Sequence, residues 1–313
     1  MTDIAAKIIP ILLLISLGCF FRYKNTFKQT TIDEVKKLVI DIAFSAVLFI
    51  TFLNMELRKE YFLVSIIIFL MLTLFYFAGI MLNMIKLIKH SLIPFFSSGF
   101  AFGFLGIPLF STIFGVENLG KLSILGIGHE FFIWLLFYTL LKIKLGNQKF
   151  SVETGIQIFK SPVIISITLG IILNLTGLGT SIHYNPIAKG LYTTIEYLSN
   201  LSTPLILIII GYGLRFNKKY MKQSVLFIMI RFIVILSIGY FMKIFVINKI
   251  VAPDLMFDYA YFTFLILPSP LTLPIFVGAS STQEYEELAN NTVVLNTVVS
   301  IVIFIIFVLT INI

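Results

Sequence analysis

Uncharged, strongly apolar runs of roughly 20 residues recur along the whole sequence, and this feature limits the fold more than any other. A helix of that length reaches across a hydrocarbon core of about 30 Å. Lipid offers no partner to backbone N–H and C=O groups, so only helices or closed barrels cross it. The apolar-polar alternation of barrel strands is absent, so we expect an all-α integral membrane protein.

The apolar runs and the short polar connections between them predict ten transmembrane helices. Their expected ranges are 4–21, 35–53, 62–85, 92–114, 122–141, 162–178, 191–214, 225–246, 257–279 and 289–311. With 58% hydrophobic and 12% charged residues, the composition is far from that of soluble domains. The single cysteine, Cys19, excludes an internal disulfide and a cysteine-based metal site.

The basic residues lie almost wholly in the connections, so the net charge of +8 indicates membrane orientation rather than a nucleic-acid partner. Fifteen Lys and Arg residues fall in the odd-numbered connections and seven in the even-numbered connections and terminal segments. The positive-inside rule therefore predicts a multi-pass protein of the cytoplasmic membrane with both termini outside the cytoplasm.

Two uncharged segments carry a proline within a predicted span. Ser97 to Thr112 contains LGIPLF and Leu265 to Ser280 contains LTLPIF, so that Pro108 matches Pro274. A proline inside a helix removes a backbone donor and breaks or kinks the helix. Matched interruptions in two halves point to the binding site of a secondary transporter. Two proline-kinked packing helices are the simpler alternative.

A second repeated pattern supports two halves. PILLLISLG (Pro10 to Gly18) and PVIISITLG (Pro162 to Gly170) share the proline, a hydroxyl residue and a closing Leu-Gly. Each half holds five spans, an odd number, so the halves enter the membrane in opposite directions. We therefore expect inverted five-helix repeats over residues 1–149 and 150–313, with the junction in the polar linker 142–161.

These patterns together resemble the auxin efflux carrier family, including its bacterial malate-permease-like members. The resemblance covers essentially the whole chain and rests on GFLGIPL (Gly103 to Leu109), Pro204 followed by LILIIIG, LPSPLTLPIF, and EELANNTVVLNTVVS (Glu286 to Ser300). It implies a ten-helix carrier in which spans four and nine cross at their broken points, with the substrate bound there and one helix bundle moving against the other.

The chain departs from the family at three polar or helix-bending positions. Ala101 stands where an asparagine is common, Ser45 where a proline is common, and Thr272 where bacterial members often have asparagine. The resemblance therefore supports the predicted fold but does not identify a particular substrate.

The substrate is expected to be a small organic anion such as a carboxylate. Each broken helix would expose a half-helix N-terminus with free amides and partial positive charge, and neither segment contains an acidic residue. The free carbonyls at the breaks could instead bind a cation, so sodium beside the substrate stays open. The predicted substrate-binding residues are Ser97, Ser98, Gly103, Gly106, Pro108, Ser269, Thr272 and Pro274.

Ionisable residues inside spans are functional candidates by default. Asp41 in the second span and Glu130, beside His129 in the fifth, are candidates for carrying a coupling proton. Hydration of Asp41 near the cytoplasmic face is the alternative. We expect Arg231 and Lys243 of the eighth span to extend their side chains to the membrane interface.

Other functions fit the sequence less well. There is no His-Glu-x-x-His, Gly-x-Ser-x-Gly or pair of membrane-depth aspartates, so an enzyme is not expected, nor is a cofactor. IIGYG (Ile209 to Gly213) resembles a potassium filter but lacks its threonine and pore helix, so its glycines are expected to permit close helix packing. A secondary transporter is the leading interpretation, and a channel or membrane sensor is the alternative. Membrane lipid is an expected partner, and a homodimer stays open.

Overall fold

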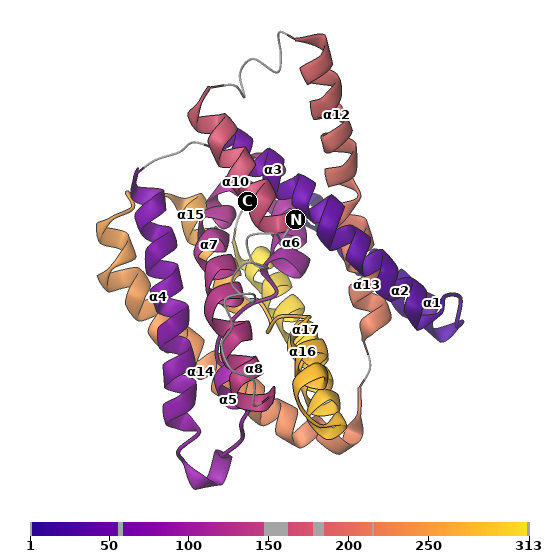
Figure 1. Ribbon diagram of the computed structural model, residues 1–313, viewed down its shortest axis with the longest axis vertical. Helices are drawn as coiled ribbons and strands as arrows, with labels where there is room; N and C mark the ends of the chain where they lie inside the picture. Colours follow the sequence, from indigo (N-terminus) through magenta and orange to yellow (C-terminus); the bar gives the residue numbers. More distant parts are fainter. Residues whose placement is uncertain (1, 56–58, 147–161, 178–184, 215, 312–313) are drawn as a thin grey trace. The chain divides into compact units, whose positions relative to one another are not determined.

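The computed structural model describes residues 2–55, 59–146, 162–177, 185–214 and 216–311 (Figure 1). Over these residues all regular structure is helical, with no strand. Five helices are long and apolar enough to cross a membrane, and they span Glu60–Leu82, Val116–Gly146, Pro186–Gly213, Lys218–Lys249 and Gln283–Thr310. Each of the ten expected ranges overlaps a helix. The prediction of an all-α membrane protein is therefore confirmed at the level of class.

The chain forms two compact units. Unit 1 comprises Met1–Arg58, Gly103–Ser123 and Gly155–Leu214, and unit 2 comprises Lys59–Phe102, Ile124–Thr154 and Arg215–Ile313. Each unit thus combines segments from both sequence halves. The predicted junction near residue 149 and the connections around Arg58 and His183 lie outside the described residues.

Unit 1 is built on two helix pairs. In one, α1 (Thr2–Tyr23) lies along α13 (Ser202–Gly213), and in the other α3 (Ser45–Asn54) lies along α10 (Pro162–Leu175) (Figure 1). Its other elements are α2 (Gln29–Leu38), the π-helical η1 (Val39–Phe44), α6 (Ile107–Phe114), η4 (Val116–Asn118) and α12 (Pro186–Asn200).

Glycine allows α1 and α13 to approach backbone to backbone. A Cβ on Gly211 would lie 1.9 Å from the carbonyl oxygen of Ile15, and one on Gly18 would lie 2.0 Å from that of Ile208. Small residues permit this spacing between membrane helices. The predicted packing role is therefore confirmed for Gly211 but not for Gly213, which has open space around it.

Unit 2 holds the long helices α4 (Lys59–Leu82), α14 (Met221–Phe245) and α17 (Gln283–Thr310). It also holds most of one continuous helix, made of α7 (Leu119–Phe132) from Ile124 onwards, η5 (Ile133–Phe137) and α8 (Tyr138–Gly146). The shorter α5 (Ile93–Phe96), α15 (Leu255–Ile266) and α16 (Leu273–Ser280) belong to the two predicted broken spans.

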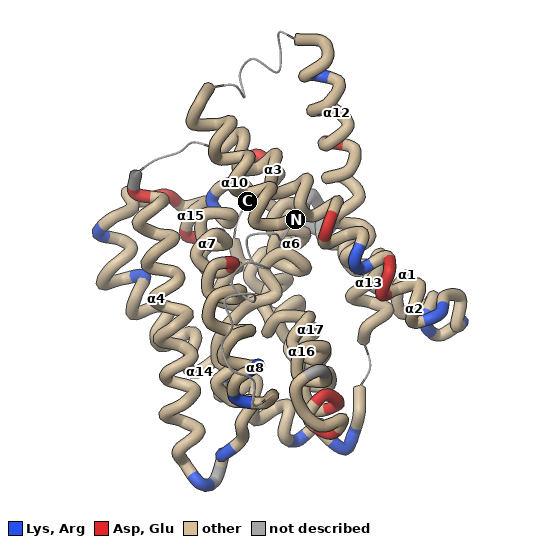
Figure 2. Tube along the Cα trace, viewed as in Figure 1, with Lys and Arg blue, Asp and Glu red and all other residues tan. Residues whose placement is uncertain are grey.

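Several connections meet at one end of unit 2. Lys219, just before α14, pairs with Glu284 at the start of α17, with 3.4 Å between Nζ and Oε1. The ring of His90, between α4 and α5, lies 4.9 Å from that of Tyr285. Lysines mark the connection after α4 and the region of α8 (Figure 2). At the opposite end, Lys243 pairs with Asp258 at 2.6 Å, so the helices of this unit alternate in direction.

Candidate functional site

Both predicted breaks exist, but neither lies at the motif proline. In the first segment the helix is interrupted at residues 97–101, where Gly99 has φ +73°, and the chain becomes helical again in the π-helical η3 (Phe102–Gly106). In the second segment it is interrupted at residues 267–272, which contain Pro268 and Pro270. The expectation that Pro108 and Pro274 make the breaks is therefore wrong.

The motif prolines lie in the helices that follow the breaks. Pro274 lies in the first turn of α16, whereas Pro108 lies where η3 passes directly into α6. The first turn tolerates proline because its N–H groups have no partner within the helix. A glycine with positive φ and a pair of prolines are stronger reasons for interruption than a first-turn proline.

The two breaks contact each other within unit 2. The backbone N–H of Ala101 donates a hydrogen bond of 2.8 Å to the carbonyl of Pro268. A Cβ on Gly99 would lie 3.2 Å from the Pro270 ring, and the rings of Phe100 and Phe264 are 4.6 Å apart. The breaks are thus joined by a backbone hydrogen bond and by packing.

Arg231 of α14 bonds to both breaks. Its Nη1 donates to the carbonyl of Phe96 at 2.6 Å, and its Nη2 donates to those of Gly99 and Leu267, both at 2.9 Å. The side chain is only 1% exposed. The predicted extension of Arg231 to the membrane interface is therefore wrong, because the interrupted helices leave carbonyls that need donors.

The positive charge of Arg231 has no acidic partner among the described residues. The side-chain ion pairs found there involve Glu130, Glu284 and Asp258, and none includes this guanidinium. The Phe100 ring lies 4.8 Å from its central carbon and adds a cation-π contact. Burial of an unpaired cation is costly, so an anion close to the breaks would be stabilised.

The second break also receives a side chain that the sequence interpretation missed. Asn296 of α17 accepts a hydrogen bond of 2.9 Å from the backbone N–H of Ser269, and it is completely buried. Thr292, Asn296 and Ser300 are all buried and recur every four residues, which places them on one face of α17. This spacing of polar residues inside an apolar helix was the available signal.

The predicted hydroxyl residues at the breaks are buried or nearly so, and most have protein partners. Ser98 donates to the carbonyl of Pro94 at 2.8 Å, and Thr272 shares a hydrogen bond with the Tyr138 hydroxyl. The Ser269 hydroxyl lies 3.5 Å from Asn296 Oδ1. Ser97 is fully buried and its hydroxyl has no partner. These residues are brought together in unit 2, with Pro274 following directly.

The other predicted binding residues belong to unit 1. Gly103, Gly106 and Pro108 lie in its segment 103–123. A Cβ on Gly103 would lie 2.3 Å from the Phe44 ring, so this glycine serves close packing.

The first turn of α16 does not offer the free amides expected at the second break. The N–H of Leu273 donates to Pro270 at 2.9 Å, and that of Ile275 donates to Thr272 at 3.1 Å. Pro274 between them has no N–H. An anion near this break would therefore depend on side-chain donors rather than on these amides.

One proton-coupling candidate is connected to the first break. His129 Nε2 accepts a 2.9 Å hydrogen bond from the backbone N–H of Phe100, so the ring proton of neutral His129 lies on Nδ1. Nδ1 is 3.3 Å from Glu130 Oε1, and Trp134 donates to Oε2 at 3.2 Å. Glu130 is buried. Asp41, in η1 of unit 1, is partly exposed.

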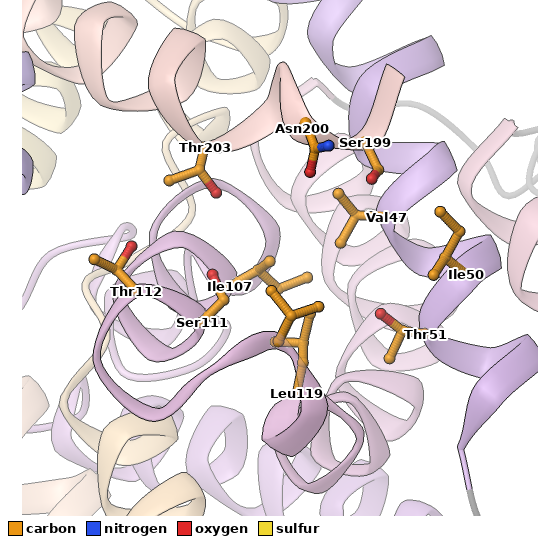
Figure 3. Close-up of a pocket in the computed structure, with 11 residues that line it drawn as sticks. Val47, Ile50, Thr51, Ile107, Ser111, Thr112, Leu119, Ser199, Asn200 and Thr203 are labelled. Atoms are coloured by element: carbon orange, nitrogen blue, oxygen red, sulfur yellow. The ribbon is translucent and has the colours of Figure 1, made fainter. Parts of the chain in front are cut away.

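Unit 1 contains a separate cavity of about 290 Å³ (Figure 3). It is lined by Val47, Ile50, Thr51, Ile107, Ser111, Thr112, Val116, Leu119, Ser199, Asn200 and Thr203. Hydroxyl and amide groups alternate with apolar side chains, and no lining residue is charged. The Ser111 and Thr112 hydroxyls donate to the carbonyl of Pro108, so they offer mainly acceptor lone pairs to this cavity.

Comparison with protein-family models and with curated proteins gives no match to this sequence. The resemblance to auxin efflux carriers therefore stays a prediction that rests on the short motifs. No cluster of three or more His, Cys, Asp or Glu side chains that could hold a metal occurs in the described part of the chain.

Proposed function

We propose that the protein is a secondary transporter that moves small organic anions across the cytoplasmic membrane by alternating access. The observation that carries this proposal is Arg231, a buried cation bonded to carbonyls of both breaks and lacking an acidic partner among the described residues. Secondary transporters typically form their binding sites from discontinuous helices near the membrane midplane.

The unpaired positive charge of Arg231 favours an anion over a cation as substrate. Three carbonyls that could have coordinated a cation already accept hydrogen bonds from Arg231. Neither broken segment contains an acidic residue that would repel an anion. A carboxylate close to Arg231 would offset the unpaired charge, which is costly at membrane depth.

An arrangement as inverted repeats agrees with the composition of the two units. Unit 1 combines the regions of expected spans one and two with those of six and seven, and unit 2 combines three and five with eight and ten. In inverted repeats of five spans, these are equivalent positions, whereas span four is divided between the units at Gly103 and span nine lies wholly in unit 2. Movement of one unit against the other would then alternate access to the site. We propose ten spans with both termini outside the cytoplasm.

Transport into reconstituted vesicles tests the proposal. Radiolabelled acetate, lactate, succinate, malate and citrate are offered under imposed proton or sodium gradients, with protein-free vesicles and a neutral and a cationic solute as controls. We expect saturable uptake of at least one acid, accelerated by unlabelled substrate on the opposite side. Flux linear in concentration without this acceleration would favour a channel, and absence of carboxylate flux would contradict the anion proposal. A protein that binds an acid without moving it would favour a sensor.

A further inference from the structure

Seven buried side-chain polar atoms among the described residues of unit 2 have no hydrogen-bond partner, and three of them lie on α14 and α17. These three are Arg231 Nε on α14, and Asn296 Nδ2 and Ser300 Oγ on α17. Arg231 and Ser300 are each 1% exposed, and Asn296 is fully buried. Buried polar groups almost always have a partner, so the three on these neighbouring helices indicate a missing component.

The three groups lie at matching depth between two parallel helices. Near their starts, α14 and α17 are joined by a 2.9 Å hydrogen bond between the hydroxyls of Ser224 and Thr292. Tyr220, before Ser224, bonds to Glu287, before Thr292, so the helices run in the same direction. Arg231 is roughly 10 Å further along α14, and Asn296 and Ser300 are roughly 6 and 12 Å further along α17.

Arg231 and Asn296 face the same backbone segment of the second break. Seven residues separate Arg231 from Ser224, which is close to two full turns, so both point toward α17. Asn296 lies about 40° around α17 from Thr292 and so shares its face toward α14, whereas Ser300 lies about 80° away, at the edge of that face. Arg231 and Asn296 both hydrogen-bond to the backbone of residues 267–269. Arg231 donates to the carbonyl of Leu267, and Asn296 accepts from the N–H of Ser269.

The unused groups are suited to an acceptor. Three carbonyls fix the guanidinium, which leaves Nε–H and one Nη1 hydrogen free. Asn296 uses its oxygen for Ser269 and keeps both Nδ2 hydrogens. Arginine and an amide nitrogen can only donate, and the serine hydroxyl can donate as well. Several donors with a net positive charge match a carboxylate, whose two oxygens only accept.

We propose that Arg231, Asn296 and Ser300 form a subsite that binds one carboxylate group of the substrate. This inference rests on the proposed function and adds residues from α14 and α17, outside the two broken segments. Arg231 supplies the charge, and Asn296 and Ser300 orient the carboxylate oxygens. Ordered water is the competing occupant, and it would satisfy the same donors without discriminating between acids and neutral solutes.

The test uses thermal unfolding of the purified full-length protein in detergent with acetate, lactate, succinate, malate and citrate as probes. Asn296→Asp keeps an oxygen for Ser269 and places a fixed carboxylate beside Arg231, in competition with the ligand. We expect its unliganded melting temperature to equal or exceed that of the wild type, while the affinity for the best probe falls at least about tenfold.

Ser300→Ala provides a second variant that should fold normally, because it only removes a buried hydroxyl without a partner. We expect about a three- to tenfold loss of affinity with unchanged stability. Ser202→Ala is the matched control, since Ser202 is equally buried, lacks a partner and lies in unit 1. It should bind as the wild type does.

The outcomes separate this inference from the proposed function. An acid could raise the melting temperature of the wild type while Asn296→Asp and Ser300→Ala retain full affinity for it. The subsite proposal would then be wrong, and the transporter proposal would stand. Equal losses in Ser300→Ala and Ser202→Ala would also overturn the subsite. If none of the five acids raises the melting temperature of the wild-type protein, both proposals fail.

Discussion

At the scale of single residues, Arg231 has the largest influence on the site. Its guanidinium replaces the donors that a continuous helix would have supplied to Phe96 and Gly99 in one segment and to Leu267 in the other. One planar group with several fixed N–H directions satisfies three carbonyls at once, which a lysine ammonium on a flexible stem does less well. The residue therefore has a structural role whether or not a substrate is bound.

We predict that Arg231→Gln lowers the free energy of unfolding by at least about 3 kcal/mol, because up to three buried carbonyls lose their donor. The measurement is thermal unfolding of purified protein in detergent. The fraction of protein that stays monodisperse is recorded as the temperature rises. Lys243→Gln on the same helix is the control. Lys243 pairs with the half-exposed Asp258, and its loss should lower stability by no more than about 1 kcal/mol. Similar effects of the two substitutions would contradict the role given to Arg231.

A second prediction at this scale concerns proton coupling. Glu130→Gln should abolish accumulation driven by a proton gradient and leave exchange of internal for external substrate largely intact, because an amide cannot carry the proton. Asp41→Asn is measured in parallel as the other candidate, and Glu284→Gln, which alters a surface ion pair, serves as control. Unchanged proton dependence in both candidate variants would show that neither acid carries the proton.

At the scale of elements, the breaks are determined by backbone geometry next to the motifs rather than by the motif prolines. Gly99 adopts φ +73°, which other residues reach only with strain. Its missing side chain also leaves room for Ile133, whose Cδ1 would lie 2.9 Å from a Cβ at this position. Pro108 and Pro274 both lie in helices beyond the breaks, so their replacement by alanine should not make either interrupted helix continuous.

We predict that Gly99→Ala lowers the free energy of unfolding by more than about 2 kcal/mol, because backbone strain of about 1–2 kcal/mol adds to the clash with Ile133 and Pro270. Gly177→Ala is the matched control, since Gly177 has nearly the same φ, +71°, but nothing within 4 Å of its Cβ position. Unfolding in detergent measures both. Equal losses would mean that strain alone matters and that the contact between the breaks contributes nothing.

At the scale of the whole molecule, the connections of unit 2 alternate between its two ends. Lys219 with Glu284, and His90 with Tyr285, bring the third, seventh and ninth expected connections to one end. Lys243 with Asp258 marks the other end. This alternation is what helices that each cross a bilayer once would produce.

We predict that an impermeant thiol reagent on intact cells labels single cysteines at Glu117 and Asn248 and does not label those at Gly146 and Lys218. The background is Cys19→Ala, which removes only a 3.2 Å contact between the thiol and the carbonyl of Gly211. Permeabilised cells show that all four positions can react. The reverse labelling pattern would place the termini in the cytoplasm.

The sequence alone determined the helical membrane class and the neighbourhood of both interruptions. These features are local, because each apolar run must satisfy its own backbone in lipid, and glycine and proline act on the residues next to them. It also predicted close packing at Gly211 and the buried position of Glu130. The breaks differ in position from the predicted ones because Gly99 and the Pro268–Pro270 pair interrupt the helices, whereas Pro108 and Pro274 lie in the helices that follow.

Only the tertiary structure decided which side chains reach the breaks. Arg231 is 135 residues from Phe96 and 36 from Leu267, and Asn296 is 27 from Ser269. In the sequence, an arginine within a span is equally suited to reach the membrane interface or the protein interior. The choice depends on where unpaired carbonyls lie in space, and these come together only when α14 and α17 pack beside the two interrupted helices.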